Sequence, residues 1–403
     1  MKYIEKFFEY LLAMFIVLEC NSVYSRCAGT RNYLLALLVL ALLALITVNF
    51  LKHKRLMIKN SMYLYGIIYF LYIDFYMFYT KLADIKFIYL FIVCLPLLVL
   101  LYLFDRNNSK KILEAIANIV FVLCIISLVF WILGPILNII HPSGSITIDW
   151  GIMKTVPSYF NLHFITQKAG IFNWFLTRNT GVFAEAPMYS LVLLIGLITN
   201  LFICKKKSTL KTLMIFIGII STISTTGIIL SCLAIGCSYI IEKQKSTNKK
   251  LFLIILAVVV LLVSSISIVF LRDKLSSMSY RTRIDDYEAS IKAWKDHIIM
   301  GNGFDNELAI RNYMSDFRKN NMGLSNSLFT LLALGGLYLF IIYLIPFIIV
   351  IKNNIRINNK IVLYSCMILL LFSLLIFHYK VLIINFLAIG YSYLKYSKDD
   401  LNE

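Results

Sequence analysis

Long apolar blocks recur along most of this 403-residue chain, and they constrain its fold more than any other feature. A helix that crosses a bilayer needs about 20 mostly apolar residues, and blocks of this kind are repeated here. Backbone polar groups inside lipid must be satisfied within a helix or a closed barrel. A barrel would require apolar and polar residues to alternate, and these blocks do not alternate. We therefore predict an all-α, polytopic transmembrane protein.

Lysine and arginine clusters between the blocks indicate the orientation of the chain. The net charge is +18, and most of it lies in segments that fall on one side if the N- and C-termini are cytoplasmic. This is the positive-inside distribution of a cytoplasmic-membrane protein, so the charge does not indicate a nucleic-acid partner. We expect about twelve spans, at residues 7–22, 32–51, 61–80, 85–104, 114–138, 184–203, 208–223, 226–241, 251–271, 327–351, 361–377 and 380–395.

Two long segments between spans fall on the outer side with this orientation. The expected division of the chain is N-terminal helices at 1–140, a first outer segment at 141–182, central helices at 183–271, a second outer segment at 272–326 and C-terminal helices at 327–403. Both outer segments contain aromatic residues and helical patterning, so we predict ordered structure in each. Long ordered loops are frequent carriers of function.

The chain lacks the motifs of several chemical classes. Its eight cysteines include no CxxC pair, so neither a zinc site nor a disulfide framework is expected. No nucleotide-binding loop, no HExxH and no nucleophile elbow is present, which argues against an ATP-driven pump or a soluble-type hydrolase. We expect no cofactor and no metal.

Candidate chemistry in the first outer segment centres on Arg178 and Glu185, where the chain enters a span. Charged residues at a membrane boundary are costly unless they are paired or used. Pro187 suits the first turn of the following helix, which would put Glu185 at the positive helix end. The alternative is that Arg178 and Glu185 pair only to shape the loop. Trp174 could stack on a sugar or anchor the chain at the interface.

The second outer segment contains a predicted amphipathic helix and a second charged group. Its apolar stripe is Ile284, Tyr287, Ile291, Trp294 and Ile298, and Gly301-Asn302-Gly303 would end the helix. Arg281 and Arg283 precede His297 and Asp305. Arginine binds phosphate through two hydrogen bonds, so these residues suit a pyrophosphate-linked lipid. The helix could lie on the membrane or form a lid, and the charges could equally belong to a solvated loop.

The order of these motifs resembles the O-antigen ligase/polymerase superfamily of bacterial membrane glycosyltransferases. Three features over roughly residues 170–345 carry the resemblance: Arg178 to Pro187, the Ser/Thr-rich turn at 223–227, and the segment from Arg281 to Phe304 followed by Leu324-Ser325-Asn326-Ser327 and Gly335-Gly336. The chain departs from the family in two places. Ser325 stands where the ligases have His, and Ala186 separates Glu185 from Pro187. The first departure favours a polymerase over a ligase.

The resemblance implies a polymerase that joins oligosaccharide repeat units carried on undecaprenyl pyrophosphate into a capsule, exopolysaccharide or O-antigen. Arg178, Arg281 and Arg283 would hold pyrophosphate, Glu185, His297 or Asp305 would act as base, and Trp174, Trp294 and Asn326 would bind substrate. A chain-length regulator and a flippase are possible partners beside membrane lipid. The alternatives are ligase-type transfer of finished glycan, a flippase or other transporter for which the single intramembrane Asp74 gives weak support, and a scaffold.

Overall fold

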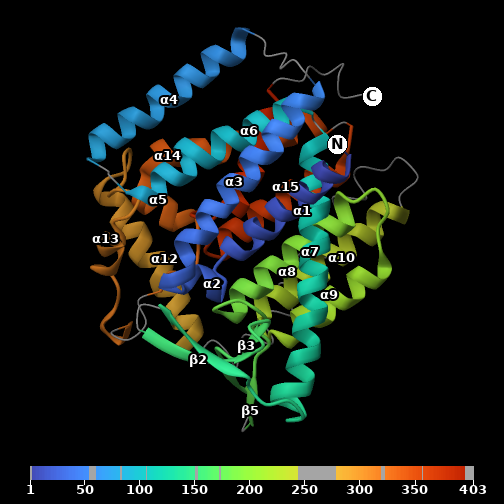
Figure 1. The fold of residues 1–403 in the computed structure, drawn as a ribbon. Coiled ribbons are helices and arrows are strands. Elements are labelled where there is room, and N and C mark those ends of the chain that lie inside the picture. Colours follow the sequence, from blue (N-terminus) through green and yellow to red (C-terminus); the bar gives the residue numbers. More distant parts are fainter. Residues whose placement is uncertain are drawn as a thin grey trace. The chain divides into compact units, whose positions relative to one another are not determined.

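The computed structural model describes residues 2–53, 60–81, 84–105, 107–149, 153–171, 174–243, 278–318, 323–355 and 357–394. Figure 1 labels the helices and strands along the chain. The chain divides into two compact units. The first contains residues 1–52 and 107–263, and the second contains residues 53–106 and 264–403. Each unit thus combines a segment from the N-terminal part of the chain with a later segment. The expected span at 251–271 lies outside the described residues.

Helix α8 (Ala186–Phe202) is the core of the first unit. Nearly every one of its residues is buried, and it packs against α7 (Asn107–Trp131), α9 (Thr209–Ser221) and α10 (Thr225–Lys243). A helix that is apolar all round is expected in such a position. Small residues permit the close packing: a Cβ on Gly227 would come within 1.9 Å of Ser190 Oγ. The unit also contains α1 (Lys2–Glu19), α2 (Val23–Arg26), α3 (Ala28–His53) and the π-helical η2 (Ile132–Ile136).

Two acidic residues of α1, Glu5 and Glu9, are buried and paired with lysines. Lys111 Nζ lies 2.6 Å from Glu5 and 3.7 Å from Glu9, and Lys52 Nζ lies 3.0 Å from Glu5. Because each charge has a partner, α1 can pack along α7 despite two carboxylates within an apolar helix.

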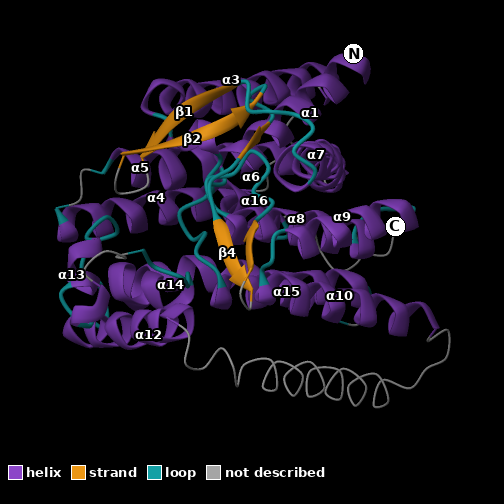
Figure 2. Cartoon of the chain, turned by 90° about the horizontal axis from the view of Figure 1, so that it is seen from below, coloured by secondary structure: helices purple, strands orange, loops and turns teal. Residues whose placement is uncertain are grey.

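The first outer segment forms strands, so the helical patterning expected there was wrong. Strands β1 (Gly144–Asp149), β2 (Met153–Tyr159) and β3 (His163–Phe164) make an antiparallel sheet, and β4 (Lys168–Ile171) pairs with β5 (Trp174–Thr177). Figure 2 shows the two sheets as separate groups of arrows. The sequence 144–159 is made of short runs with β-branched residues, and such runs favour hairpins over helices.

The second unit is built around α16 (Val381–Ser392), which is buried between α6 (Leu95–Phe104) and α14 (Leu328–Asn354). The other elements are α4 (Asn60–Thr80), α5 (Ile85–Phe87), η1 (Ile88–Cys94), α12 (Met278–Asp296), α13 (Glu307–Arg311), η3 (Asp316–Arg318) and α15 (Asn359–Leu374). Asp74 is exposed on α4. Tyr72 and Tyr338 stack at 3.8 Å, and each hydroxyl donates to the other's backbone carbonyl, which fastens α4 to α14.

Helix α14 is broken at Gly336, whose φ of 62° and ψ of −169° are not helical. Ser327 Oγ accepts from the backbone N–H of His378 at 3.1 Å, and the Tyr343 hydroxyl donates to the carbonyl of the same His378 at 2.5 Å. A straight helix would separate residues 327 and 343 by about 24 Å. The chain therefore turns sharply at Gly336, and residues 328–335 run in a different direction from the apolar stretch that follows.

The turn at residues 298–303 satisfies the backbone groups that this break leaves open. Asn302 N donates to Ala333 O, Gly303 N donates to Leu334 O, and the carbonyls of Ile298 and Ile299 accept from residues 337 and 338. Gly301 and Gly303 have positive φ, and α12 ends at Asp296, five residues before the glycine turn expected to end it. Irregular backbone inside a membrane protein is tolerated where protein covers it, as here.

The described apolar helices coincide with the expected spans. They confirm the predicted fold class, an all-α polytopic membrane protein. Six of them are long and apolar enough to cross a bilayer: α3, α4, the α5–η1–α6 segment, α7 with η2, α10 and α14. Helices α8, α9, α15 and α16 are apolar but shorter.

Candidate functional site

The Arg178 guanidinium is held by the turn between α9 and α10. Its Nε donates to Thr222 O at 2.8 Å and its Nη2 to Ile223 O at 3.5 Å. Ile223 has a φ of 53°, a conformation that is costly for a β-branched residue. This backbone turns two carbonyls toward the guanidinium. The first and second motifs of the sequence, 44 residues apart, therefore meet at one side chain.

Asn179 fixes the backbone beside this arginine. It is fully buried, and its Nδ2 donates to Ser221 Oγ at 2.9 Å and to Ser127 Oγ at 3.3 Å. Its backbone N–H donates to Ser221 O at 3.0 Å. Gly181 follows with a φ of 53°, and a Cβ there would come within 3.1 Å of the Tyr189 ring. Helices α7, α8 and α9 thus hold the Arg178 loop in one conformation.

Glu185 is the N-cap residue of α8, and Pro187 lies in the first turn, as the sequence predicts. The Glu185 side chain does not cap the helix. Gln167 takes part of that role, because its Oε1 accepts from Ala186 N at 3.0 Å and from Arg178 Nη1 at 3.5 Å. Gln167 therefore links the arginine to the positive end of α8, where an anion is stabilised. Sequence analysis missed this residue, because a single Gln in a loop carries no signal.

Trp174 begins β5 and pairs through the backbone with Ile171. Its hairpin leads directly to Thr177, whose carbonyl accepts from the Trp131 indole at 2.9 Å. The backbone of Trp174 is thereby fixed four residues before Arg178.

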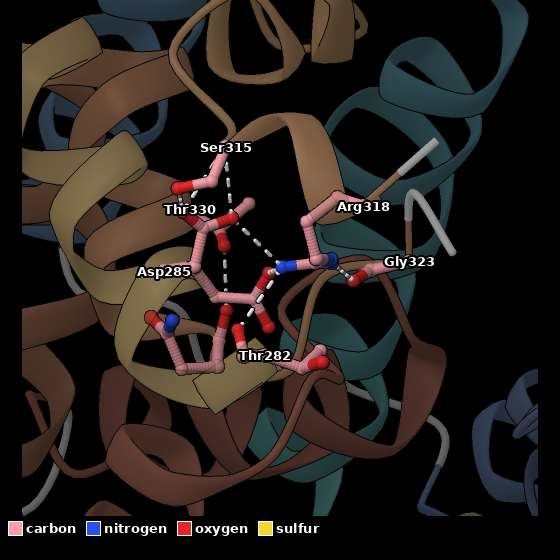
Figure 3. Close-up of polar contacts among 8 residues, drawn as sticks. Thr282, Asp285, Ser315, Arg318, Gly323 and Thr330 are labelled. Atoms are coloured by element: carbon pink, nitrogen blue, oxygen red, sulfur yellow. Dashed lines mark hydrogen bonds and ion pairs between the residues drawn. The ribbon is translucent and has the colours of Figure 1, made fainter. Parts of the chain in front are cut away.

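Arg318 is the centre of a buried ion network in the second unit (Figure 3). Its Nη1 lies 2.7 Å from Asp286 and 3.2 Å from Asp285, and it also donates to Thr282 O at 3.0 Å. Its Nη2 donates to Gly323 O at 2.8 Å. Sequence analysis missed this arginine, because residues 285, 286 and 318 look like a solvated charged face when each is considered alone.

The expected apolar stripe is not the face that α12 buries. Ile284 and Ile298 are exposed, whereas Asp285, Asp286, Ala289, Ser290 and Ala293 are buried. The small residues let α12 approach α14, and Arg318 compensates the carboxylates. Trp294 packs against this small-residue cluster and donates to Ile298 O at 3.0 Å, and these contacts fix its position.

Several polar atoms near the start of α14 are buried, and among the described residues Asn326 Nδ2 has no hydrogen-bond partner. Burial raises the pKa of Asp286, while its interactions with the Ser325 hydroxyl and with Arg318 act in the opposite direction. The Asn326 Oδ1 accepts from Phe329 N at 3.0 Å and so caps α14. The Ser325-Asn326 pair of the sequence therefore occupies a buried polar site beside Arg318.

Helix α12 separates the charged residues that sequence analysis grouped together. Arg281 is exposed with its guanidinium 5.0 Å over the Phe317 ring, and the half-buried Arg283 lies near Tyr287. His297 and Asp305 are exposed at the other end of the helix. At 1.5 Å per residue, about 24 Å separates residues 281 and 297 along the axis. These arginines and His297 therefore do not form one site, and Arg178 and Glu185 belong to the other unit.

Comparison with known families matches a model described as O-antigen ligase to residues 210–344, about one third of the chain. The chain resembles the O-antigen ligases. The matched region includes the turn that holds Arg178, the Arg318 network, Asn326 and the break in α14. It supports the O-antigen ligase/polymerase superfamily. No curated protein and no solved structure matches the chain.

Proposed function

We propose that this protein is a membrane glycosyltransferase that polymerises undecaprenyl-pyrophosphate-linked repeat units into a surface polysaccharide. The observation that carries the proposal is the fixed Arg178 guanidinium, which is bound to carbonyls at 222 and 223 inside the region that resembles O-antigen ligases. A guanidinium held by carbonyls keeps its charge and its orientation, as stabilisation of a leaving pyrophosphate requires.

The proposed reaction replaces one bond to an anomeric carbon by another. The bond between the growing glycan and its pyrophosphate oxygen breaks, and undecaprenyl pyrophosphate leaves with the electron pair. A hydroxyl oxygen of the next lipid-linked unit bonds to the same carbon, and its proton passes to a base. Glu185, at the N-terminus of α8 in the same unit as Arg178, is the proposed base. His297 and Asp305 in the other unit are the alternatives.

Arg281 and Arg283 are also proposed to bind pyrophosphate, and Trp174, Trp294 and Asn326 are proposed to position sugars. Arginines can neutralise the leaving group without a divalent ion, so we expect polymerisation to continue in excess EDTA. The reaction is proposed to occur at the outer face of the cytoplasmic membrane, with a chain-length regulator and a flippase as partners.

Inactivation of the gene in its native host tests the proposal. Lipid-linked and surface glycans are then sized by electrophoresis. Single repeat units that accumulate on lipid outside the cell support a polymerase. Long chains that form but never reach their final acceptor support a ligase, the function after which the matched family model is named. Single units retained on the cytoplasmic face would indicate a flippase and overturn the assignment of the arginines.

A further inference from the structure

Three parts of the second unit meet at His378 and Tyr379: α5, the connection from α15 to α16, and the turn that follows Gly303. Lys86 Nζ lies 3.9 Å from the Tyr379 ring centroid and Lys380 Nζ lies 4.8 Å from it. The ring of His378 packs edge-on against Tyr379 at 4.9 Å and against Phe304 at 5.9 Å. Two ammonium groups and an imidazole are thus gathered around one phenol ring.

The backbone of this cluster is fixed. Ser327 and Tyr343 bind the N–H and the carbonyl of His378, on either side of the break in α14. Lys380 is the N-cap residue of α16, and its side chain makes no capping hydrogen bond. The positive end of a twelve-residue helix therefore adds to the two lysine charges. Nearby acidic groups are Asp84, whose carboxylate caps α5, and the exposed Asp305.

The His378 side chain supplies an observation that points to a ligand. The residue is 3% exposed, and its Nδ1 makes no hydrogen bond within the part of the chain that the structure describes. Burial, together with the charges of Lys86 and Lys380, holds the pKa of His378 well below its usual range, so the ring is neutral. A neutral imidazole beside two ammonium groups can donate a hydrogen bond to a phosphate oxygen, or accept one from a hydroxyl.

We propose that Lys86, Lys380 and His378 form an anion site for the acceptor, the lipid-linked repeat unit that receives the growing glycan. The site would hold the pyrophosphate of this acceptor, which remains attached to its lipid during transfer. The inference rests on the proposed function, because that reaction brings together two pyrophosphate-linked lipids and only one of them loses its carrier. Arginine suits the leaving pyrophosphate, since it binds in a fixed bidentate geometry. Lysine acts as a mobile point charge and suits a group that is bound without reacting.

Native mass spectrometry of the full-length protein in phosphatidylcholine nanodiscs tests the site. The probes are undecaprenyl pyrophosphate, phosphatidylglycerol and inorganic pyrophosphate. We expect up to two undecaprenyl pyrophosphates on the wild type, one on Arg178→Ala and one on Lys86→Gln/Lys380→Gln. The matched control is Lys360→Gln, an exposed lysine at the opposite end of α15, which should retain two. Thermal melting of each variant identifies loss of fold. The charge-conserving variant Lys86→Arg/Lys380→Arg should retain two bound undecaprenyl pyrophosphates.

A kinetic readout separates binding from chemistry. With short lipid-linked acceptors, the double Gln variant should raise KM for the acceptor about tenfold or more and leave kcat within about twofold. Two lipids on the double Gln variant, or equal loss in Lys360→Gln, would overturn the inference. So would equal occupancy by phosphatidylglycerol, which would assign the site to bulk headgroups. Competition by excess inorganic pyrophosphate would support recognition of the pyrophosphate group. A wild type that binds no undecaprenyl pyrophosphate would instead refute the proposed function itself.

Discussion

At the scale of single residues, Arg178 is held by more than the local loop that carries it. Its guanidinium donates to Thr222, Ile223 and Gln167, which lie 44, 45 and 11 residues away. Carbonyl partners fix the orientation of a guanidinium without changing its charge, and a fixed positive charge suits the binding of an anion.

Arg178→Ala should abolish chain growth, with protein level and membrane insertion retained. Arg178→Lys keeps the charge but cannot reproduce two diverging hydrogen bonds to the turn, so we expect a loss of about 100-fold in kcat. Polymer length from a complemented null strain and in vitro turnover measure the effect. Near-normal polymer from Arg178→Ala would contradict the assignment, and Lys154→Gln, which alters a lysine of the outer sheet, is the control.

His163 should make the first unit sensitive to acid. It is fully buried in β3, its ring nitrogens make no hydrogen bond to any residue that the structure describes, and burial lowers its pKa to about 4. The unfolded chain binds a proton near pH 6.5, so the free energy of unfolding falls as pH drops from 6.5 toward 4, by about 1.4 kcal/mol per pH unit. His163→Met should reduce the difference in Tm between pH 7 and pH 5. The exposed His141→Met should leave that difference unchanged.

At the scale of elements, the broken helix α14 and the turn at 298–303 form one structure. Each supplies the hydrogen bonds that the other lacks, and the backbones approach so closely that only glycine fits. A Cβ on Gly336 would lie 2.2 Å from Ile299 O, and one on Gly301 would lie 2.3 Å from Leu334 O. Gly301 and Gly303, which in the sequence suggested a simple helix end, therefore allow the turn at 298–303 to pack against the break in α14.

Gly336→Ala and Gly301→Ala should each disrupt this packing, because backbone must move and both positions have positive φ. We expect little folded protein, or a Tm lowered by several degrees with loss of polymer. Size-exclusion chromatography and thermal melting in detergent provide the measurement. Gly66→Ala on α4 has no atom within 4 Å of the added Cβ and should behave as wild type. Wild-type melting of Gly336→Ala would show that the break is not required.

Arg318 joins α12 to the segment that follows it, and its removal should be costly. Arg318→Met leaves two buried carboxylates uncompensated, which we expect to destabilise the second unit by about 3 kcal/mol or more. Arg311→Met removes an exposed i,i+4 pair with Glu307 and should cost about 0.5 kcal/mol or less. Denaturation of both variants in the same detergent compares them directly. Equal destabilisation of the two variants would mean that the buried Arg318 network contributes no more stability than the exposed Arg311–Glu307 pair.

At the scale of the whole molecule, the positive-inside distribution predicts which connections face the cytoplasm. Lys205, Lys206 and Lys207 would be cytoplasmic, and the β-sheet segment and α12 would be outside. Truncated fusions to alkaline phosphatase test this, since the enzyme is active only outside. Fusions after residues 145 and 300 should be active, and fusions after 206 and 356 should be inactive. The reverse pattern would place both candidate sites on the cytoplasmic side.

The sequence by itself determined the class of the fold, the position of the described apolar helices and the order of the family-like motifs. Apolar block length and the order of motifs are properties of the linear sequence. Pro187 and Glu185 were likewise placed by local rules. The tertiary structure alone decided which residues meet. The carbonyls that hold Arg178, the Arg318 network and the doubling back of α14 depend on contacts between segments far apart in the chain. No local pattern records such contacts, and a buried charge looks the same in sequence as a solvated one.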